Sequence, residues 1–501
     1  MDNSNDTINI NLTEPLVSTS QSQSSPQEQQ FHVAQKQVDV EIINTDEDDD
    51  STVPTALGLL FYKSLFFLSG LSASTWGRFG VIFYNRVANL NPFQIGILQG
   101  VMPLVSLVTT PCWGIMADCI YSRKRVYLFC NIVNTFCLLT LALIKKPTFL
   151  SILICVSGMS FFTASGVLDA FVLDYLGERY RSKYGTVRLW ASISWGLGAF
   201  IMGFVTDMYG FQWNFVLYVS MMFTNIGIVW YGLPARSKSE QERYDVQHSN
   251  SIDSDSATDV SFSRRSILQG VLKEVICRPV VIVWLFQVIV IGAAMSLVDS
   301  FLFVYLQNDL SASTKLCGTT VGVTVIFEIP IFYYSKWLLS HVGHDMLFII
   351  SMIAYSTRVF GYTLLTKDTV YWILPLEILH GVTYACMWIA SVDFACRVSP
   401  AEWSTTVQAI LSASFGCFGY FIGSIVGGWV LQNYSAVVMY RGMGSIIVVI
   451  LMSHLVIWVL FRKGYNRFLE KYEQDCVVTP RDNQESLLTT NKNSKIDIVN
   501  V

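Results

Sequence analysis

Long apolar runs, separated by short polar segments, fill the chain between residues 57 and 461. A hydrocarbon core about 30 Å thick is crossed by about 20 apolar residues in a helix. Runs such as Ile446 to Leu460 are apolar on every side and lack the alternation that a membrane β-strand requires. The pattern predicts an all-α integral membrane protein with twelve transmembrane helices. They are expected near residues 57–84, 93–117, 126–144, 149–175, 187–207, 213–232, 280–305, 316–338, 346–365, 370–395, 404–431 and 436–461.

The two sets of six spans repeat each other along the chain. A shift of 220 residues places Gly203 on Gly423, and a shift of 222 residues places Gly96 on Gly318. Small residues at such positions let membrane helices approach closely. Two parallel six-helix repeats around a cavity near the middle of the membrane form the architecture of major facilitator transporters. We therefore predict the major facilitator fold.

Lysines and arginines in the short loops predict the orientation of the helices. The loops after spans two, four, six, eight and ten hold 15 of these residues when Lys336, at the end of the eighth span, is counted, and the opposite loops hold 5. Because positively charged loops stay on the cytosolic side, both chain termini are expected in the cytosol. The sequence leaves open whether the membrane is the plasma membrane or an internal one.

Polar segments predict the organisation of the chain around the helices. Residues 1–53 contain eleven acidic residues, one base and no apolar periodicity, so we expect a disordered, acidic, cytosolic tail. The six-helix halves are expected at 54–232 and 276–462. A cytosolic loop, 233–275, joins them, and a cytosolic tail, 463–501, follows.

Composition argues against several classes of protein. Apolar residues make up 52 % of the chain and charged residues 14 %, against roughly 25 % charged residues in soluble globular proteins. A soluble enzyme and a nucleic-acid-binding protein are therefore not expected, and no catalytic residues are predicted. The 11 cysteines are scattered without Cys/His ligand spacing, so neither a metal site nor a cofactor is expected.

The loop between the second and third predicted spans carries a motif. It contains Gly114, Asp118 and Arg123. This resembles the G-x-x-x-D-(R/K)-x-G-x-(R/K) loop of the major facilitator superfamily, although Cys119 and Tyr121 replace a base and a glycine. The resemblance implies a gating loop in which the glycine packs two helices and the aspartate centres an ionic network. The alternative is an ordinary positively charged loop.

The fourth and fifth spans resemble the oligosaccharide and nucleoside proton-symporter branch, which includes lactose permease. The matching stretches are Leu168-Asp169-Ala170-Phe171, Tyr184-Gly185-Thr186-Val187-Arg188 and Ser194-Trp195-Gly196. The resemblance implies that Asp169 and Arg188 bind substrate hydroxyl groups and that Trp195 stacks on the ring. A carboxylate accepts hydrogen bonds and a guanidinium donates them, so together they can hold a neutral polyhydroxyl ring. The alternative is an ion pair between helices with no ligand.

Three stretches in the second half of the chain carry a further resemblance. They are Phe301-Leu302-Phe303-Val304-Tyr305-Leu306, Leu374-Pro375-Leu376-Glu377-Ile378-Leu379-His380-Gly381-Val382-Thr383 and Tyr440-Arg441-Gly442-Met443-Gly444. They resemble the eukaryotic major facilitator superfamily domain-containing protein 6 family. The resemblance covers roughly residues 57 to 461, in matching order, and does not indicate a substrate.

Several charged residues fall within the predicted spans, where each costs about 2.5–3.5 kcal/mol unless it pairs, titrates or faces water. Glu377 and His380 are three residues apart and share one helix face. A histidine beside a buried acid can bind and release a proton near neutral pH. The likeness to lactose permease implies a coupling role for His380 and for Arg358 on the preceding span. Glu377 and Thr383 depart from its pattern, with Glu377 in the basic position and Thr383 in the acidic one. Glu377 is expected to substitute for the lost acid in proton coupling; a uniporter or a static polar network stays open.

Two further acids extend this group. Asp299 and Glu328 are expected to pair with Arg358 and to contribute to proton coupling, and Glu328 precedes Pro330, where a broken helix can line a cavity. Arg78, near the end of the first span, is expected to be interfacial or packed.

The sequence therefore favours a multi-pass transporter that moves a small polar solute, such as a sugar or nucleoside, by alternating access, with proton symport as one mechanism. The expected partners are the lipid bilayer, the solute and protons; we expect a monomer that binds no nucleic acid. The alternative is a membrane receptor or scaffold that uses the same fold without transport. A weak glycosylation site is predicted at Asn433, in a short loop close to the bilayer.

Overall fold

The computed structural model describes residues 54–144, 146–180, 183–236, 240–241, 244–245, 275, 277–399 and 403–477. Within these ranges the secondary structure is helical and contains no β-strand. The chain divides into two units, Met1–Thr55 and Ala56–Val501, and every helix named below belongs to the second. The predicted tail of residues 1–53 and most of the predicted central loop lie outside the described residues, so their predicted organisation stays a prediction.

The N-terminal half begins with a helix that is broken near its end. Its elements are α2 (Ala56–Trp76), α3 (Phe79–Ile82), the π-helix η2 (Phe83–Val87), α4 (Pro92–Ile120), α5 (Arg123–Leu143), α6 (Pro147–Tyr180), α7 (Tyr184–Tyr209) and α8 (Gln212–Gly232).

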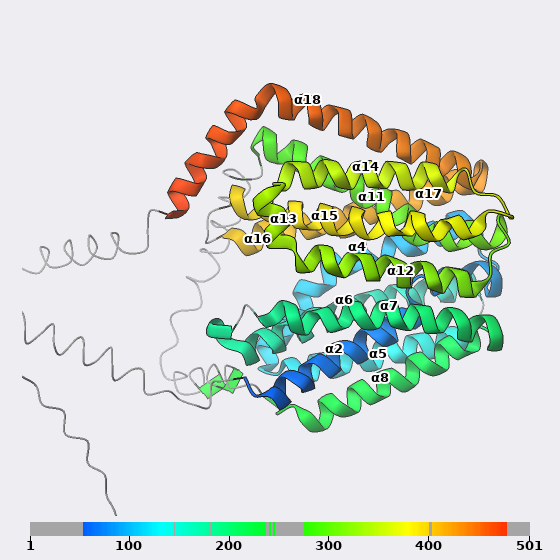
Figure 1. Ribbon diagram of the computed structural model, residues 1–501. Coiled ribbons are helices and arrows are strands. Elements are labelled where there is room, and N and C mark those ends of the chain that lie inside the picture. Colours follow the sequence, from blue (N-terminus) through cyan, green and yellow to red (C-terminus); the bar gives the residue numbers. More distant parts are fainter. Residues whose placement is uncertain are drawn as a thin grey trace, which may run out of the picture. The chain divides into compact units, whose positions relative to one another are not determined.

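The C-terminal half begins at α11. Its elements are α11 (Pro279–Asn308), α12 (Thr314–Tyr333), α13 (Ser335–His341), α14 (His344–Tyr362), the 3-10 helix η5 (Val370–Trp372), α15 (Ile373–Val398), α16 (Ser404–Ala413), the π-helix η7 (Ser414–Gly419), α17 (Tyr420–Asn433) and α18 (Ala436–Val477). The long helices lie side by side, and α2 begins at the same end of the bundle at which α18 ends (Figure 1). We call this the near end and the opposite one the far end.

The predicted spans agree closely with the observed helices. In the described residues, 11 helical segments are long and apolar enough to cross a membrane, and a bent pair raises the number to 12. The pair consists of α13 and α14, which meet at an angle of 108°. The ninth predicted span corresponds to α14, whereas α13 overlaps the end of the eighth. The eighth predicted span, 316–338, is too long: α12 ends at Tyr333, three residues after Pro330.

Departures from α-helical geometry occur in two spans that both contact α11. The first span breaks at Gly77 and Arg78, between α2 and α3. The eleventh contains the π-helix η7 immediately before Tyr420. Such irregular turns re-aim the side chains beside them and are frequent at functional sites. Here they position Arg78 and Tyr420.

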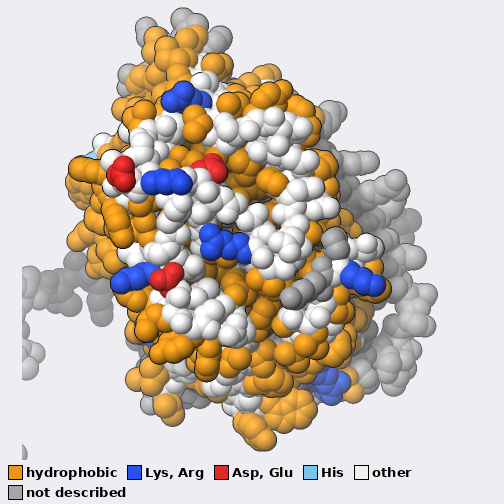
Figure 2. Space-filling model, turned by 90° about the vertical axis from the view of Figure 1, so that its right-hand side faces the viewer, with side chains coloured by type: hydrophobic (Ala, Val, Ile, Leu, Met, Phe, Trp, Pro, Cys, Tyr) orange, Lys and Arg blue, Asp and Glu red, His pale blue; other side chains and the backbone are white. Residues whose placement is uncertain are grey.

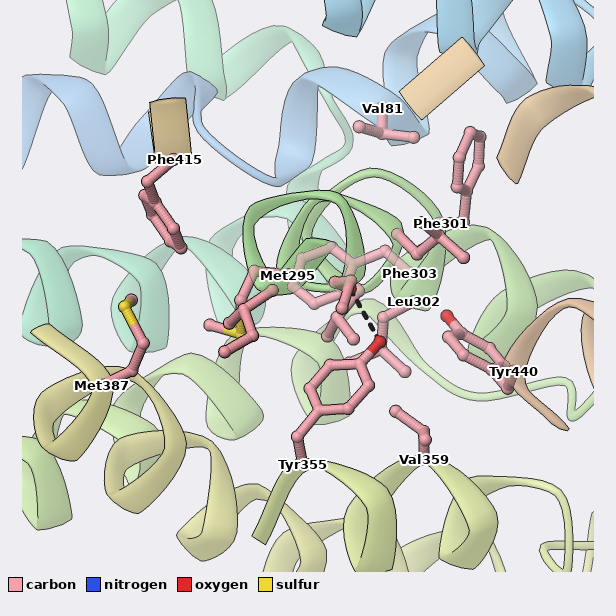
Figure 3. Packing of buried hydrophobic residues seen from close by; sticks show 14 of the residues in the cluster. Val81, Met295, Phe301, Leu302, Phe303, Tyr355, Val359, Met387, Phe415 and Tyr440 are labelled. Carbon is pink, nitrogen blue, oxygen red and sulfur yellow. Dashed lines mark hydrogen bonds between the residues drawn. The ribbon is translucent and has the colours of Figure 1, made fainter. Parts of the chain in front are cut away.

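The apolar core centres on α11, which is enclosed by other helices over most of its length. Phe301, Leu302 and Phe303 are consecutive, and each is at most 2 % exposed, so this helix is buried on all sides. Figure 3 shows their side chains together with those of Tyr355 and Tyr440 from neighbouring helices. The Tyr355 hydroxyl donates a hydrogen bond to the Ala294 carbonyl at 2.8 Å, drawn as the dashed line (Figure 3). These contacts hold α11, and with it Asp299, in a fixed position.

Glycines bring the two halves into contact along two seams. In the first, α7 packs against α12, and a Cβ atom on Gly203 would lie only 2.8 Å from the Cα of Gly318. In the second, α4 packs against α17, and a Cβ atom on Gly96 would lie 2.3 Å from the Ser424 carbonyl oxygen. Gly203, Gly318 and Gly96 belong to the set that the internal repeat brings into register, and glycine is required where main chains approach this closely.

Hydrogen bonds join the halves at the far end. Asn308 Nδ2 donates to Asn85 Oδ1 at 3.0 Å, the Thr314 N–H donates to Asp207 Oδ1 at 3.0 Å, and the Phe93 N–H donates to Gln432 Oε1 at 3.3 Å. Figure 2 shows this far-end face, on which charged side chains are few and scattered. The two halves are therefore held together at the far end by both seams and these polar contacts.

Candidate functional site

A cavity of about 620 Å³ lies between the two halves. Helices of both halves line it, from α2 to α17. Five of the residues singled out in the sequence lie on its wall: Arg188, Trp195, Asp299, Glu328 and His380. Asp169 and Glu377 lie behind the wall, each beside a wall residue. The sequence therefore brings most of its predicted site residues to one cavity.

The pair predicted on the fourth and fifth spans is present. Arg188 on α7 donates from Nη1 to Asp169 Oδ2 on α6 at 2.5 Å and to the Tyr184 hydroxyl at 2.6 Å. The Arg188 side chain is 52 % exposed, whereas that of Asp169 is 20 % exposed. Asp169 thus fixes the guanidinium from behind, while the arginine retains free N–H groups toward the cavity.

Trp195 reaches the cavity because α2 offers a gap at Gly77. A Cβ atom on Gly77 would lie 2.5 Å from Cη2 of the Trp195 ring. The indole therefore packs against the bare main chain at the break between α2 and α3. This contact places an aromatic face one residue from Arg78, on the same wall as Arg188.

Arg78 forms the polar centre of the site, and the sequence analysis did not identify it as such. Its Nη2 atom forms an ion pair with Asp299 on α11 and lies 3.2 Å from His380 Nε2 on α15. Tyr420 donates its hydroxyl to the other Asp299 oxygen at 2.6 Å. Of the two expectations for Arg78, interfacial or packed, the structure agrees with the packed one, since the first span continues to Val87 and the side chain is only 12 % exposed.

Glu377 and His380 lie together on α15, as their spacing predicts. Glu377 accepts hydrogen bonds from the Tyr362 hydroxyl at Oε1 and from the Thr324 hydroxyl at Oε2, the latter at 3.1 Å. His380 Nδ1 lies 3.8 Å from Glu377 Oε2 and forms no hydrogen bond within the described part of the chain. The imidazole thus stands between a carboxylate and the Arg78 guanidinium.

Arg358 does not pair with Asp299 or Glu328, which corrects the expectation from the sequence. Its side chain is fully buried on α14 against Tyr355 and Tyr362, with the guanidinium carbon 5.4 and 5.8 Å from the two ring centres. Its Nη2 atom lies 3.8 Å from the Met295 sulfur. Aromatic faces attract guanidinium groups. Met295 lines the cavity and separates Arg358 from it.

Glu328 lies on the cavity wall next to the site centre. Its helix, α12, approaches α15 so closely that a Cβ atom on Gly381 would lie 2.9 Å from the Glu328 nitrogen. Among the described residues, no basic nitrogen lies within 4.0 Å of its carboxylate and no side chain forms a hydrogen bond with it. Glu328 is thus a carboxylate on the wall with no partner in that part of the chain.

The predicted gating loop makes contacts on the near side of the N-terminal half. Arg123 Nη1 lies 3.8 Å from Asp174 Oδ2 on α6, and Arg123 Nε lies 3.6 Å from Glu240 Oε1. The Asp118 side chain lies outside the described part of the structure. No described atom comes within 4 Å of a Cβ atom built on Gly114, so the helix packing expected at this glycine does not occur in this conformation.

Asn433 is the last residue of α17 and is exposed. Its Nδ2 atom donates to the Trp429 carbonyl at 2.8 Å, so the amide is held by its own helix. Glycosylation there stays a prediction. In the described residues, no group of three His, Cys, Asp or Glu side chains is placed to hold a metal ion.

Comparison with known proteins gives consistent matches over the helical part. The model of the MFS_1 like family matches residues 63–442. Maltose permease of Geobacillus stearothermophilus is 20 % identical over 391 residues, which cover 76 % of this chain and 89 % of that protein. The human major facilitator superfamily domain-containing protein 6-like is 23 % identical over 154 residues, 30 % of this chain and 26 % of that protein.

Among solved structures, the crystal structure of nucleoside transporter NupG superimposes with a TM-score of 0.65. The two sequences are 14 % identical, and the match covers 80 % of this chain and 98 % of that one. This similarity confirms the predicted fold.

Proposed function

Because this chain belongs to the MFS_1 like family of the major facilitator superfamily, and is therefore a multi-pass membrane transporter, we propose that it carries a small, polar, sugar- or nucleoside-like solute by alternating access. The observation that carries this proposal is Arg188, which lies on the wall of a cavity shared by both halves and is held there by Asp169. The proteins that it resembles are transporters and not enzymes.

The chemistry of the cavity supports a polar, uncharged ring as part of the solute. Its volume of about 620 Å³ falls within the range of about 300–1,000 Å³ that is usual for small-molecule sites. Arg188 supplies directed donors on the wall, Asp169 holds the guanidinium in place from behind the wall, and Trp195 supplies an apolar face for a ring. The name of the maltose permease relative agrees with a solute that bears hydroxyl groups.

Alternating access needs a cavity that opens at one end while the other stays closed. The seams at Gly203 and Gly96, with the far-end hydrogen bonds, close one end in this conformation. Separation of the halves there, with closure at the near end, would expose the same wall residues to the opposite side. With the predicted orientation, both termini and the near end face the cytosol.

Proton coupling is the second part of the proposal. His380 lies between Glu377 and Arg78, and Asp299 and Glu328 are close by on the same wall. A histidine in contact with both a carboxylate and a guanidinium can move a proton as the halves separate. Arg358 is buried behind Met295. Its guanidinium is a second positive charge, besides Arg78, that acts on His380.

Transport can be tested with the purified full-length protein in liposomes that contain a pH-sensitive dye. A panel of labelled sugars and nucleosides is added outside, and uptake and internal pH are recorded together. Uptake of one class with internal acidification is the result expected for a proton symporter. Uptake or exchange without acidification would leave a uniporter, and no movement of any solute would favour the receptor or scaffold.

Proton coupling predicts a specific effect of His380→Ala. Uptake by the wild-type protein should change with external pH if His380 binds and releases the coupled proton, and the variant should lose this dependence. The matched control is His341→Ala, because His341 is exposed on α13 and stacks on Trp337 outside the cavity. Initial uptake rates measured at five pH values give both profiles, and an unchanged profile in His380→Ala would remove this residue from the mechanism.

A further inference from the structure

We propose that the solute carries a cationic ammonium group and that Glu328 binds it. This inference rests on the proposed transport function and narrows its substrate class. It starts from the charges on the cavity wall, which are Arg78, Arg188, Asp299 and Glu328.

Three of these four charges are already matched. Arg188 pairs with Asp169 behind the wall at 2.5 Å, and Arg78 pairs with Asp299. Asp299 also accepts the Tyr420 hydroxyl at 2.6 Å, so neither of its oxygens is left without a donor. Arg78 acts on Glu328 only through space, beyond the 4.0 Å of an ion pair. The Arg78 guanidinium is thus the neighbouring positive charge for both Asp299 and Glu328. Because it pairs with Asp299, Glu328 has no cation of its own.

The groups around Glu328 do not supply that charge. On the neighbouring helix α15, His380 directs one ring nitrogen to Arg78 and the other toward Glu377. Arg358 is separated from the cavity by Met295. An ionised carboxylate in a partly dry cavity is costly without a counter-ion. A cation from the solute is therefore the group that this position lacks.

Aromatic rings beside Glu328 strengthen the case for an ammonium group. Tyr384 and Tyr420 both line the cavity, and Phe415 connects them, with ring centres 6.3 Å from Tyr384 and 5.7 Å from Tyr420. Aromatic faces attract cations, most strongly where water is excluded. A carboxylate next to such a row suits an amine better than a neutral hydroxyl group. The Asp169–Arg188 pair on the opposite half would then hold the polar part of the solute.

The test compares ligands that differ in one charge. Binding to the purified protein in detergent is measured for three matched pairs: glucosamine and glucose, tyramine and 4-hydroxyphenethyl alcohol, and choline and 3,3-dimethylbutan-1-ol. We expect at least one cationic member to bind at least tenfold more tightly than its neutral counterpart. Glu328→Gln should weaken that cation by about 10- to 100-fold, as for the loss of a charge-assisted hydrogen bond, and should leave the neutral member unchanged.

Two further variants make the result specific. Glu328→Asp keeps the charge and should retain part of the affinity. Asp368→Asn removes an exposed carboxylate from the loop before α15 and should change nothing. Equal or tighter binding of the neutral members, no binding of either kind, or cation binding that survives Glu328→Gln would each overturn the proposal.

A proton is the other cation that Glu328 can bind. Proton uptake measured on the same purified protein distinguishes it from an ammonium group. If neutral members bind with uptake of one proton, and Glu328→Gln abolishes that uptake, the carboxylate serves a proton and the ammonium proposal fails. Binding does not require transport. A cation that binds through Glu328 but never crosses the liposome membrane would therefore refute the transport of that solute while the binding site stands.

Discussion

Arg188→Ala is expected to reduce solute uptake by at least about 100-fold while the protein still folds and reaches the membrane. Its guanidinium donates to Asp169 at 2.5 Å and projects its remaining donors toward the cavity. Loss of hydrogen bonds to a charged group costs about 1.5–3 kcal/mol each, and the change also leaves Asp169 in a cavity wall without its cation. Uptake of the transported solute into liposomes, normalised to the amount of folded protein, measures the effect.

Two controls distinguish a loss of solute binding from the effect of leaving the Asp169 carboxylate without its cation. The double variant Arg188→Ala/Asp169→Asn removes both charges, so it should fold as well as the wild type but remain inactive if these groups hold the solute. Arg441→Ala removes an exposed arginine on α18 that contacts Thr363 away from the cavity, and its uptake should be unchanged. Normal uptake by Arg188→Ala would show that the pair is only a structural link between α6 and α7.

Arg78→Ala is expected to be the most destabilising single change in the site. Asp299 would lose its ion pair, and two carboxylates on one wall, Asp299 and Glu328, would face each other without a cation between them. Removal of one partner of a buried ion pair costs about 3–5 kcal/mol. We therefore expect a clear drop in the unfolding temperature of the detergent-purified protein and a lower yield of monodisperse material.

A compensating change tests the cause of that drop. Arg78→Gln combined with Asp299→Asn removes both charges while the polar contact with the Tyr420 hydroxyl remains possible. Most of the lost stability should return in this double variant. If it is as unstable as Arg78→Ala alone, the arginine stabilises the bundle through packing and not through its charge.

The helices were predictable because hydropathy is a local property of the sequence. Runs of about 20 apolar residues mark each span, and the α-helix is the structure that satisfies the backbone within one segment. The breaks were not predictable in the same way. The interruption at Gly77 and Arg78 leaves the average hydropathy of the span intact, and the end of α12 at Tyr333 lies within the predicted eighth span.

The candidate site was predictable where two groups share a helix or lie on adjacent helices. Glu377 and His380 are three residues apart, and Asp169 and Arg188 lie on consecutive spans. Arg78 and Asp299 are 221 residues apart, and nothing in either segment indicates the other. The first span ends at Val87, in the π-helix η2, and not at the predicted residue 84. That turn geometry has no sequence signature comparable to hydropathy.

The glycine seams also determine what water meets when the far end opens. At Gly203 and Gly318, and at Gly96 beside Ser424, the facing surfaces are main chain and not apolar side chains. Wetting apolar surface costs about 25 cal/mol per Å², but the carbonyl groups and glycine Cα atoms exposed here present little of it. Entry of water between the halves therefore costs little free energy at the points where they touch most closely. A larger apolar residue at these positions would raise the free energy of both conformations. Its side chain would clash when the seam is closed and would be exposed to water when the seam is open.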